Sequence, residues 1–280
     1  MSAKSPGTRV HAAAGLAVVL FTGTLAAAEL QPSTVKAFDT YVAAAEARSA
    51  TPFLWLDTRP AAERQRLLAD LRNGELIIER LRVRPGGREL DVPDGMIHHW
   101  LGTVFIPNTT AADAVKLLQD YDRHAAIYAP TVARSRLLSR KGDEFRFSLR
   151  FVMTKVITVV VDGEHHARFA WFGPGRARSW IRSTRLAEVT GAGTSAEREE
   201  PAGKGGGYLW RLNSYWRFDE RDGGVYLECE SVSLTRDIPF GLGWIVGPFV
   251  TSLPRESLEF TLQTTRRALM NEARPARGGG

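Results

Sequence analysis

The chain has 280 residues, of which 44% are hydrophobic and 24% are charged, and its formal net charge is +6. This length is ample for one large domain or two small ones, and the composition excludes collagen-like, coiled-coil and wholly disordered proteins. The single cysteine, Cys229, excludes an intramolecular disulfide, a structural zinc site built on several thiolates and a Cys-ligated iron–sulfur cluster.

The first 28 residues have the pattern of a secretory signal peptide. A short basic start with Lys4 and Arg9 is followed by an uncharged apolar stretch, which ends in three alanines at Ala28, just before Glu29. An uncleaved membrane anchor is the alternative, but the glycines, threonines and alanines of this stretch make a poor span. We therefore expect cleavage after Ala28 and a periplasmic or secreted protein.

Removal of this leader changes the charge balance. It contains two of the 37 basic residues and none of the 31 acidic ones, so the net charge falls to +4. The remaining basic residues are dispersed, without a run of five or more. We therefore expect no nucleic-acid partner.

Residues 29–93 are expected to form a helical extension, with helices between residues 34 and 82. Val35, Phe38 and Val42 keep helical spacing, and a second helical run follows further along the chain. A junction rich in glycine and proline then places a boundary near residue 93. No chemistry is visible in this extension, so it is interpreted as a packing element or a spacer.

Residues 94–273 have the pattern of a strand-rich domain, and residues 274–280 that of a disordered tail. A first strand is followed by a helix that Thr109 or Thr110 can cap, and a final helix begins near Ser252 or Leu253. Strands are predicted at residues 100–106, 134–140, 144–152, 155–162, 165–172, 179–190, 207–218 and 224–236.

For three of these strands, alternation of apolar and polar residues predicts which side chains share a face of the sheet. In the strand at 144–152, four apolar residues face one way, and Arg146 and Arg150 face the other. The last two strands are predicted to pair as a hairpin through Asp222-Gly223, which places Arg217 beside Glu228 on the face opposite the apolar side chains. The four apolar residues of the strand at 144–152 are Phe145, Phe147, Leu149 and Phe151.

The order of elements between about residues 97 and 271 resembles the START-like superfamily, which includes polyketide cyclase/dehydrase and coenzyme Q-binding proteins. The resemblance implies an α+β helix-grip fold, in which a curved antiparallel sheet wraps around a long C-terminal helix, here with an N-terminal helical extension. It also implies a cavity for sterols, phospholipids, quinones or polyketides. The stretches that carry it are Trp100–Pro107, Leu117–Tyr121, Tyr128–Pro130, Ser183–Arg185, Gly207–Arg211, Gly224–Glu228 and Ser233–Pro239.

The cavity that the resemblance implies would be lined by inward aromatic side chains, although each of them could equally belong to the core. Arg182 and Arg236 are the candidates for holding a carboxylate or phosphate head group. The aromatic candidates are Phe145, Phe147, Phe151, Trp210, Trp216 and Phe218.

The apolar loop at residues 238–250 has two interpretations. Phe240, Trp244 and Phe249 could form a gate at the mouth of the cavity, in transient contact with a membrane. The alternative is a buried connection beneath the final helix.

The remaining candidates for chemistry are weak. Adjacent histidines in a strand point to opposite faces, so neither His98-His99 nor His165-His166 supplies two metal ligands from one side. His124 could act as an acid or base, but a surface turn explains it more simply. No catalytic residue, metal or cofactor is expected. Binding of a hydrophobic molecule, as a carrier or sensor, is favoured over a cyclase/aromatase-type enzyme or hydrolase and over a partner-binding module.

Overall fold

The computed structural model describes residues 28–48, 52–155, 157–238, 247 and 252–272. Its main feature is a nine-stranded antiparallel sheet in the order β2-β3-β11-β10-β7-β6-β5-β4, with β8 paired to β7, while β1 and β9 pair separately. The strands are β1 (Ala28–Glu29), β2 (Ile77–Arg80), β3 (Gly95–Pro107), β4 (Val132–Lys141), β5 (Glu144–Thr154), β6 (Thr158–Trp171), β7 (Arg176–Thr190), β8 (Arg198–Glu199), β9 (Lys204–Gly205), β10 (Arg211–Arg221) and β11 (Gly224–Arg236). The helices are α1 (Pro32–Arg48), η1 (Trp55–Thr58), α2 (Ala61–Arg72), η2 (Pro85–Gly87), α3 (Ala111–Gln119), η3 (Tyr121–Arg123), α4 (His124–Ile127) and α6 (Leu253–Glu272).

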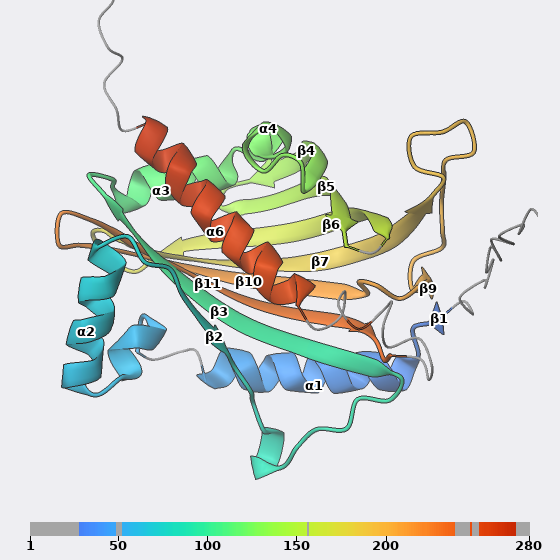
Figure 1. The fold of residues 1–280 in the computed structure, drawn as a ribbon, viewed down its shortest axis with the longest axis horizontal. Helices are drawn as coiled ribbons and strands as arrows, with labels where there is room; N and C mark the ends of the chain where they lie inside the picture. Colours follow the sequence, from blue (N-terminus) through green and yellow to red (C-terminus); the bar gives the residue numbers. More distant parts are fainter. Residues whose placement is uncertain (1–27, 49–51, 156, 239–246, 248–251, 273–280) are drawn as a thin grey trace, which may run out of the picture.

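The C-terminal helix α6 lies across one face of the curved sheet, and α1 runs along the other side (Figure 1). The predicted stripe of α6 is buried, with Leu258, Leu262, Thr265 and Leu269 all 4% exposed or less. Helix and sheet meet closely at Gly102 of β3, where any side chain would collide with Leu262. The expected α+β helix-grip fold is therefore confirmed by the arrangement of the elements.

The predicted alternation of the strand at residues 144–152 is confirmed in β5. Phe145 and Phe147 of β5 are buried in the core under α6, whereas Arg146 and Arg150 project from the other face toward acidic residues of β6. The hairpin of β10 and β11 has the predicted register, in which Arg217 pairs with Glu228. Asp222 and Gly223, with φ angles of 57° and 77°, form its turn because both positions need positive φ in this type of hairpin.

The start of α3 shows the predicted cap at Thr110. The Asp113 backbone N–H donates to Thr110 Oγ1 at 3.1 Å, and the Thr110 backbone N–H donates to Asp113 Oδ2 at 3.2 Å, which completes a capping box. We expect Thr110→Ala to lower the free energy of unfolding by about 1 kcal/mol, and Thr110→Ser to leave it almost unchanged, because only alanine removes the acceptor. Urea denaturation of both variants tests this, and equal losses would contradict the role of the cap.

The expectation of an all-helical stretch up to residue 82 is wrong at its end. Helix α2 stops at Arg72, and Gly74, whose φ is 100°, turns the chain back. Residues Ile77–Arg80 then form β2, which pairs with β3 and so belongs to the large sheet. The two isoleucines favour an extended chain over a helix once a neighbouring strand offers hydrogen bonds.

The rest of the N-terminal segment covers the back of the sheet. Phe38, Tyr41 and Val42 of α1 pack on Trp210, which lies just before β10, and on residues of β10 and β11. Residues of η1 and α2 form a second cluster on Leu101, Phe105 and Tyr226. Helices α1, η1 and α2 of the segment are therefore packed against the sheet, while the boundary near residue 93 stays a prediction.

Candidate ligand cavity

A cavity of about 210 Å³ lies between α6, the α3–α4 region and the strands β5, β6, β7, β10 and β11. Most of its walls are apolar. The helices contribute side chains such as Leu118 and Leu258, and the strands contribute Leu149, Ile181 and Leu212. It therefore occupies the space between sheet and helix in which the sequence resemblance places a binding site.

Three of the six predicted aromatic residues line this cavity: Phe147, Phe151 and Trp216. Phe145 and Phe218 lie on the same face of the sheet, 2% and 0% exposed, but they are packed in the solid part of the core. Alternation identifies the face of a strand, whereas the position of a residue along the strand decides whether it meets the cavity or the core.

Trp210 does not line the cavity. It is buried against α1, in a cluster with Phe38 and Tyr41 on the back of the sheet. The two-residue alternation of β10 does not apply to Trp210, because β10 begins only at Arg211. The turn before β10, with Gly207 at a φ of 73°, breaks the two-residue period.

The two predicted anchors, Arg182 and Arg236, also do not line the cavity. Their neighbours Ile181 and Thr235 do, so alternation places both arginines on the other face of the sheet. Arg182 pairs with Glu46 of α1, with an N–O distance of 2.5 Å. Arg236 donates a hydrogen bond to the carbonyl of Gly206 at 3.2 Å. The cavity therefore has no cationic anchor among the residues that the structure describes.

Five aromatic side chains with polar atoms line the cavity wall outside the predicted set. Two of them are Tyr128 and Tyr208. The other three are Tyr121, His124, which the sequence suggests only as an acid or base, and His165. All three are buried, and the Tyr121 hydroxyl and both histidine Nε2 atoms have no hydrogen-bond partner within the described part of the chain. Burial lowers the pKa of each histidine to about 4, so both rings are neutral near pH 7, and it raises the pKa of Tyr121.

The expectation that His124 lies on a surface turn is wrong, because it is only 7% exposed. The two short helices η3 and α4 bury Tyr121 and His124 in the core, while Asp122, Arg123 and Ala126 stay exposed. Tyr121 stacks on Phe147 with ring centroids 3.8 Å apart, and Phe147 stacks on His165 at 5.1 Å. The histidine doublet 165-166 does alternate as predicted, since its second member is exposed beside Glu144. The local sequence carried no signal that the turn at His124 would be covered.

Hydroxyl side chains form another part of the wall. Ser231, Ser233 and Thr235 of β11 and Ser214 of β10 all line the cavity. The three β11 residues extend the series of inward-facing positions of that strand, whose earlier members are apolar residues up to Cys229. The signal was present in the sequence, because the two-residue period continues past Cys229 with small polar residues in place of apolar ones.

The predicted gate residues Phe240, Trp244 and Phe249 lie outside the described residues. Whether they open or cover the cavity stays a prediction. Residues just before and after that loop, Thr235 and Leu253, line the cavity.

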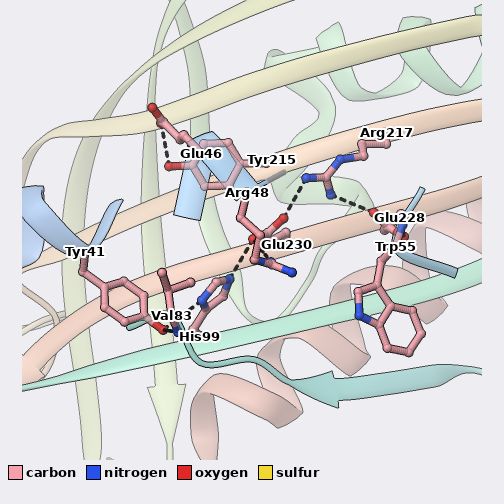
Figure 2. Close-up of polar contacts among 10 residues, drawn as sticks. All are labelled: Tyr41, Glu46, Arg48, Trp55, Val83, His99, Tyr215, Arg217, Glu228 and Glu230. Carbon is pink, nitrogen blue, oxygen red and sulfur yellow. Dashed lines mark hydrogen bonds and ion pairs between the residues drawn. The ribbon is translucent and has the colours of Figure 1, made fainter. Parts of the chain in front are cut away.

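A second polar site lies on the opposite face of the sheet (Figure 2). Arg217 makes two ion pairs of 2.7 Å, one with Glu228 and one with Glu230, and Glu230 also accepts a hydrogen bond from His99 Nε2 at 2.8 Å. All four side chains are 6% exposed or less. The cross-strand pair predicted for Arg217 is therefore part of a larger buried cluster.

The N-terminal segment completes this buried cluster. The Trp55 backbone N–H donates to Glu228 Oε2 at 2.9 Å, Arg48 pairs with Glu230 at 3.1 Å, and the Tyr41 hydroxyl lies 3.0 Å from His99 Nδ1 (Figure 2). The cluster therefore joins α1 and η1 to β3, β10 and β11.

The two buried carboxyl groups of this cluster differ in their pKa values. Burial raises the pKa of Glu228 to about 7, and the charge of Arg217 only partly opposes it. Burial would raise the pKa of Glu230 as well, but the hydrogen bond from His99 and the charge of Arg217 outweigh it and lower that pKa to about 2. Glu230 is thus the firmly ionised partner of Arg217.

Comparisons with known proteins find likeness in fold but not in sequence. No family model and no curated protein matches the sequence. Among solved structures, a STAR-related lipid transfer protein from Xanthomonas axonopodis is 18% identical, with a TM-score of 0.45 over 69% of this chain and 98% of its own. The Zhui aromatase/cyclase from Streptomyces sp. R1128 is 12% identical, with a TM-score of 0.45 over 66% of this chain and 100% of its own.

A START superfamily protein from Mycobacterium smegmatis is also similar, at 11% identity and a TM-score of 0.39 over 63% of this chain and 97% of its own. The fold that the resemblance to START-like proteins implies is confirmed by the sheet and the helices of this chain themselves. At these identities and TM-scores the comparisons say nothing about ligand or activity, which depend on the cavity itself.

Two further properties of the described residues concern membrane-spanning helices and metal sites. None of the helices there is long and apolar enough to cross a membrane. No group of three or more histidine, cysteine, aspartate or glutamate side chains within the described ranges is placed to hold a metal ion.

Proposed function

We propose that this protein binds a hydrophobic small molecule, such as a lipid, sterol or quinone, in the cavity beneath α6 and acts as its carrier or sensor. The observation that carries the proposal is an internal space of about 210 Å³ walled mainly by apolar side chains. An apolar cavity of roughly 150 Å³ is enough to bind benzene, so this one has room for a molecule of about one or two rings without movement of its walls.

We further propose that the protein works outside the cytoplasm, after removal of the leader at residues 1–28. The basic start, apolar stretch and terminal alanines of that segment support this location. A carrier there would exchange its ligand in transient contact with a membrane. The apolar loop at residues 238–250 is our candidate for that contact, because its aromatic side chains suit a membrane interface.

An enzyme of the cyclase/aromatase type is the second candidate. It is favoured by a neutral histidine beside a tyrosine at the cavity wall, His124 and Tyr121, whose ring centroids are 5.0 Å apart. A neutral imidazole can accept a proton from a bound ligand. Native mass spectrometry of the purified protein with a bound compound separates the candidates, since a carrier returns the compound unchanged and an enzyme converts it.

Binding is tested with prodan, an uncharged probe built on a two-ring naphthalene, whose fluorescence rises and moves to shorter wavelength in an apolar site. We expect the wild-type protein to bind it and Leu149→Trp to bind it at least about tenfold more weakly, because the indole fills part of the cavity. Ser148→Trp is the matched control, since the neighbouring residue of β5 projects from the other face and should bind the probe as the wild type does.

Equal binding by both tryptophan variants would place the probe elsewhere and contradict the proposal. So would a purified protein that carries no compound and leaves the fluorescence of the probe unchanged at every concentration.

A further inference from the structure

One wall of the cavity carries hydroxyl groups that have no hydrogen-bond partner among the described residues. Ser214 of β10 lies directly opposite Ser231 of β11, and Ser233 follows two positions later on the same face. Side chains at alternate positions of a strand stand on the same side of the sheet, so all three hydroxyls are directed toward the cavity. Within the described part of the chain, the hydroxyl groups of these three serines make no hydrogen bond. We call Ser214, Ser231 and Ser233 the serine patch.

The residue that follows the serine patch on this face is already engaged. Thr235 Oγ1 lies 3.0 Å from His98 Nε2 and donates to the carbonyl of Arg236 at 3.1 Å. The serine patch is therefore the part of this wall that is free to hydrogen-bond a bound molecule.

The remaining walls are mainly hydrocarbon, with polar atoms that come from other elements. Strand β5 contributes Phe147, Leu149 and Phe151, and helix α6 contributes Leu258 beside Ser257 and Thr261. The other polar side chains include Tyr121, His124 and His165. A ligand in the cavity would therefore meet a row of three serine hydroxyl groups along one edge and mainly hydrocarbon elsewhere. Burying the polar oxygens of a ligand is costly unless they are hydrogen-bonded, so the serine patch selects where those oxygens lie.

The cavity also offers nothing to balance a charge. None of the described side chains that line it is an aspartate, glutamate, lysine or arginine. The two histidines of the wall, His124 and His165, are neutral near pH 7 because burial lowers the pKa of each to about 4. A carboxylate or phosphate inside the cavity would therefore be buried without a counter-charge, which is strongly unfavourable.

Building on the proposed function, we infer that the ligand is uncharged and carries hydroxyl or carbonyl oxygens along one edge, which hydrogen-bond to Ser214, Ser231 and Ser233 while its apolar body contacts β5 and α6. A serine hydroxyl both donates and accepts, so it serves either kind of oxygen. Free fatty acids and phosphate esters whose head group would enter the cavity are the wrong class.

The experiment compares three probes with the same two-ring body: naphthalene, 2-naphthol and 2-naphthoate. Isothermal titration calorimetry at pH 7.5 measures their affinities for the wild-type protein, at which pH the naphthol is neutral and the naphthoate is charged. We expect 2-naphthol to bind roughly five- to twentyfold more tightly than naphthalene, as one or two hydrogen bonds provide, and 2-naphthoate to bind most weakly.

The variant Ser214→Ala/Ser231→Ala tests the role of the serine patch. We expect it to reduce the preference for 2-naphthol over naphthalene to roughly twofold or less, and to leave the affinity for naphthalene unchanged, because only the hydroxyls are removed. Ser148→Ala, on the outer face of β5, is the control and should keep the wild-type preference. A urea denaturation curve confirms that each variant is folded, and either single serine variant serves if the double variant is not.

The outcomes separate the two proposals. If naphthalene and 2-naphthol bind the wild type equally, or if 2-naphthoate binds most tightly, the inference about the ligand class is wrong while the proposed function stands. An unchanged preference in the double variant also overturns the assignment to the serine patch. If none of the three probes binds, the proposed function itself fails for this cavity.

Discussion

Acidification from pH 6.5 to pH 4.5 is expected to lower the free energy of unfolding by about 5 kcal/mol. Burial lowers the pKa of three histidines, His98, His124 and His165, to about 4 in the folded protein, against an ordinary value near 6.5. Between these values the unfolded chain binds three protons that the folded protein does not. The contribution of the three neutral histidines to the free energy of unfolding is therefore fully present above pH 6.5 and is lost as the pH falls toward 4.

Glu228 opposes this trend. Its folded pKa is raised to about 7, so between pH 4.5 and 7 the folded protein holds one proton that the unfolded chain lacks. Between about pH 4.5 and pH 6.5 the unfolded state thus binds a net two protons more, which corresponds to about 2.7 kcal/mol per pH unit. Below pH 4.5, protonation of Glu230, whose folded pKa is about 2, removes further stability.

Urea denaturation at pH 5, 6 and 7 measures this dependence. The variant His165→Phe keeps an aromatic ring beside Phe147 and should reduce the slope to about 1.4 kcal/mol per pH unit, since one titrating group is gone. His166→Phe, at the adjacent position of β6, is the control for the introduced phenylalanine. A stability that does not change between pH 7 and pH 5 would refute the explanation.

Removal of the guanidinium of Arg217 should be among the most damaging single substitutions in the protein. We expect Arg217→Met to lower the free energy of unfolding by about 3–5 kcal/mol, because Glu228 and Glu230 remain buried without their common cation. The loss should be measured by urea denaturation at pH 7.

The control for this substitution is Arg146→Met. Arg146 pairs with Glu164 at 3.4 Å on the surface, with its side chain 59% exposed, and an exposed pair of this kind contributes about 1 kcal/mol at most. Similar losses for the two variants would show that the buried cluster contributes no more than a surface ion pair.

Local patterns predicted the parts of the fold that each strand or helix determines by itself. The two-residue period of β5 identified the inward face of Phe147, and the helical stripe through Leu262 identified the buried face of α6. The pairing of Arg217 with Glu228 followed from matching two apolar faces across a tight turn. In each case the period of the sequence matched the geometry of one element.

What the sequence could not supply were properties that depend on several elements at once. Trp210 was assigned to the cavity because the start of β10 was placed four residues too early for the alternation to hold. For Arg182 and Arg236 the local alternation is too weak to identify the face of the strand, and their positions in β7 and β11 place them on the back of the sheet. Ile77–Arg80 became a strand only because β3 provides a partner. The burial of His124 likewise results from tertiary packing.

The two outer strands of the large sheet have a consequence for self-association. An open strand edge offers unpaired N–H and C=O groups to other chains and is a hazard for aggregation. Strand β2 covers the middle of the β3 edge, from Trp100 to Thr103, so the segment before residue 93 shields it. The other edge, β4, is exposed and carries two register shifts and the charges of Arg136 and Lys141, which disfavour pairing with another molecule. A truncated chain without β2 would therefore uncover an edge that lacks those safeguards.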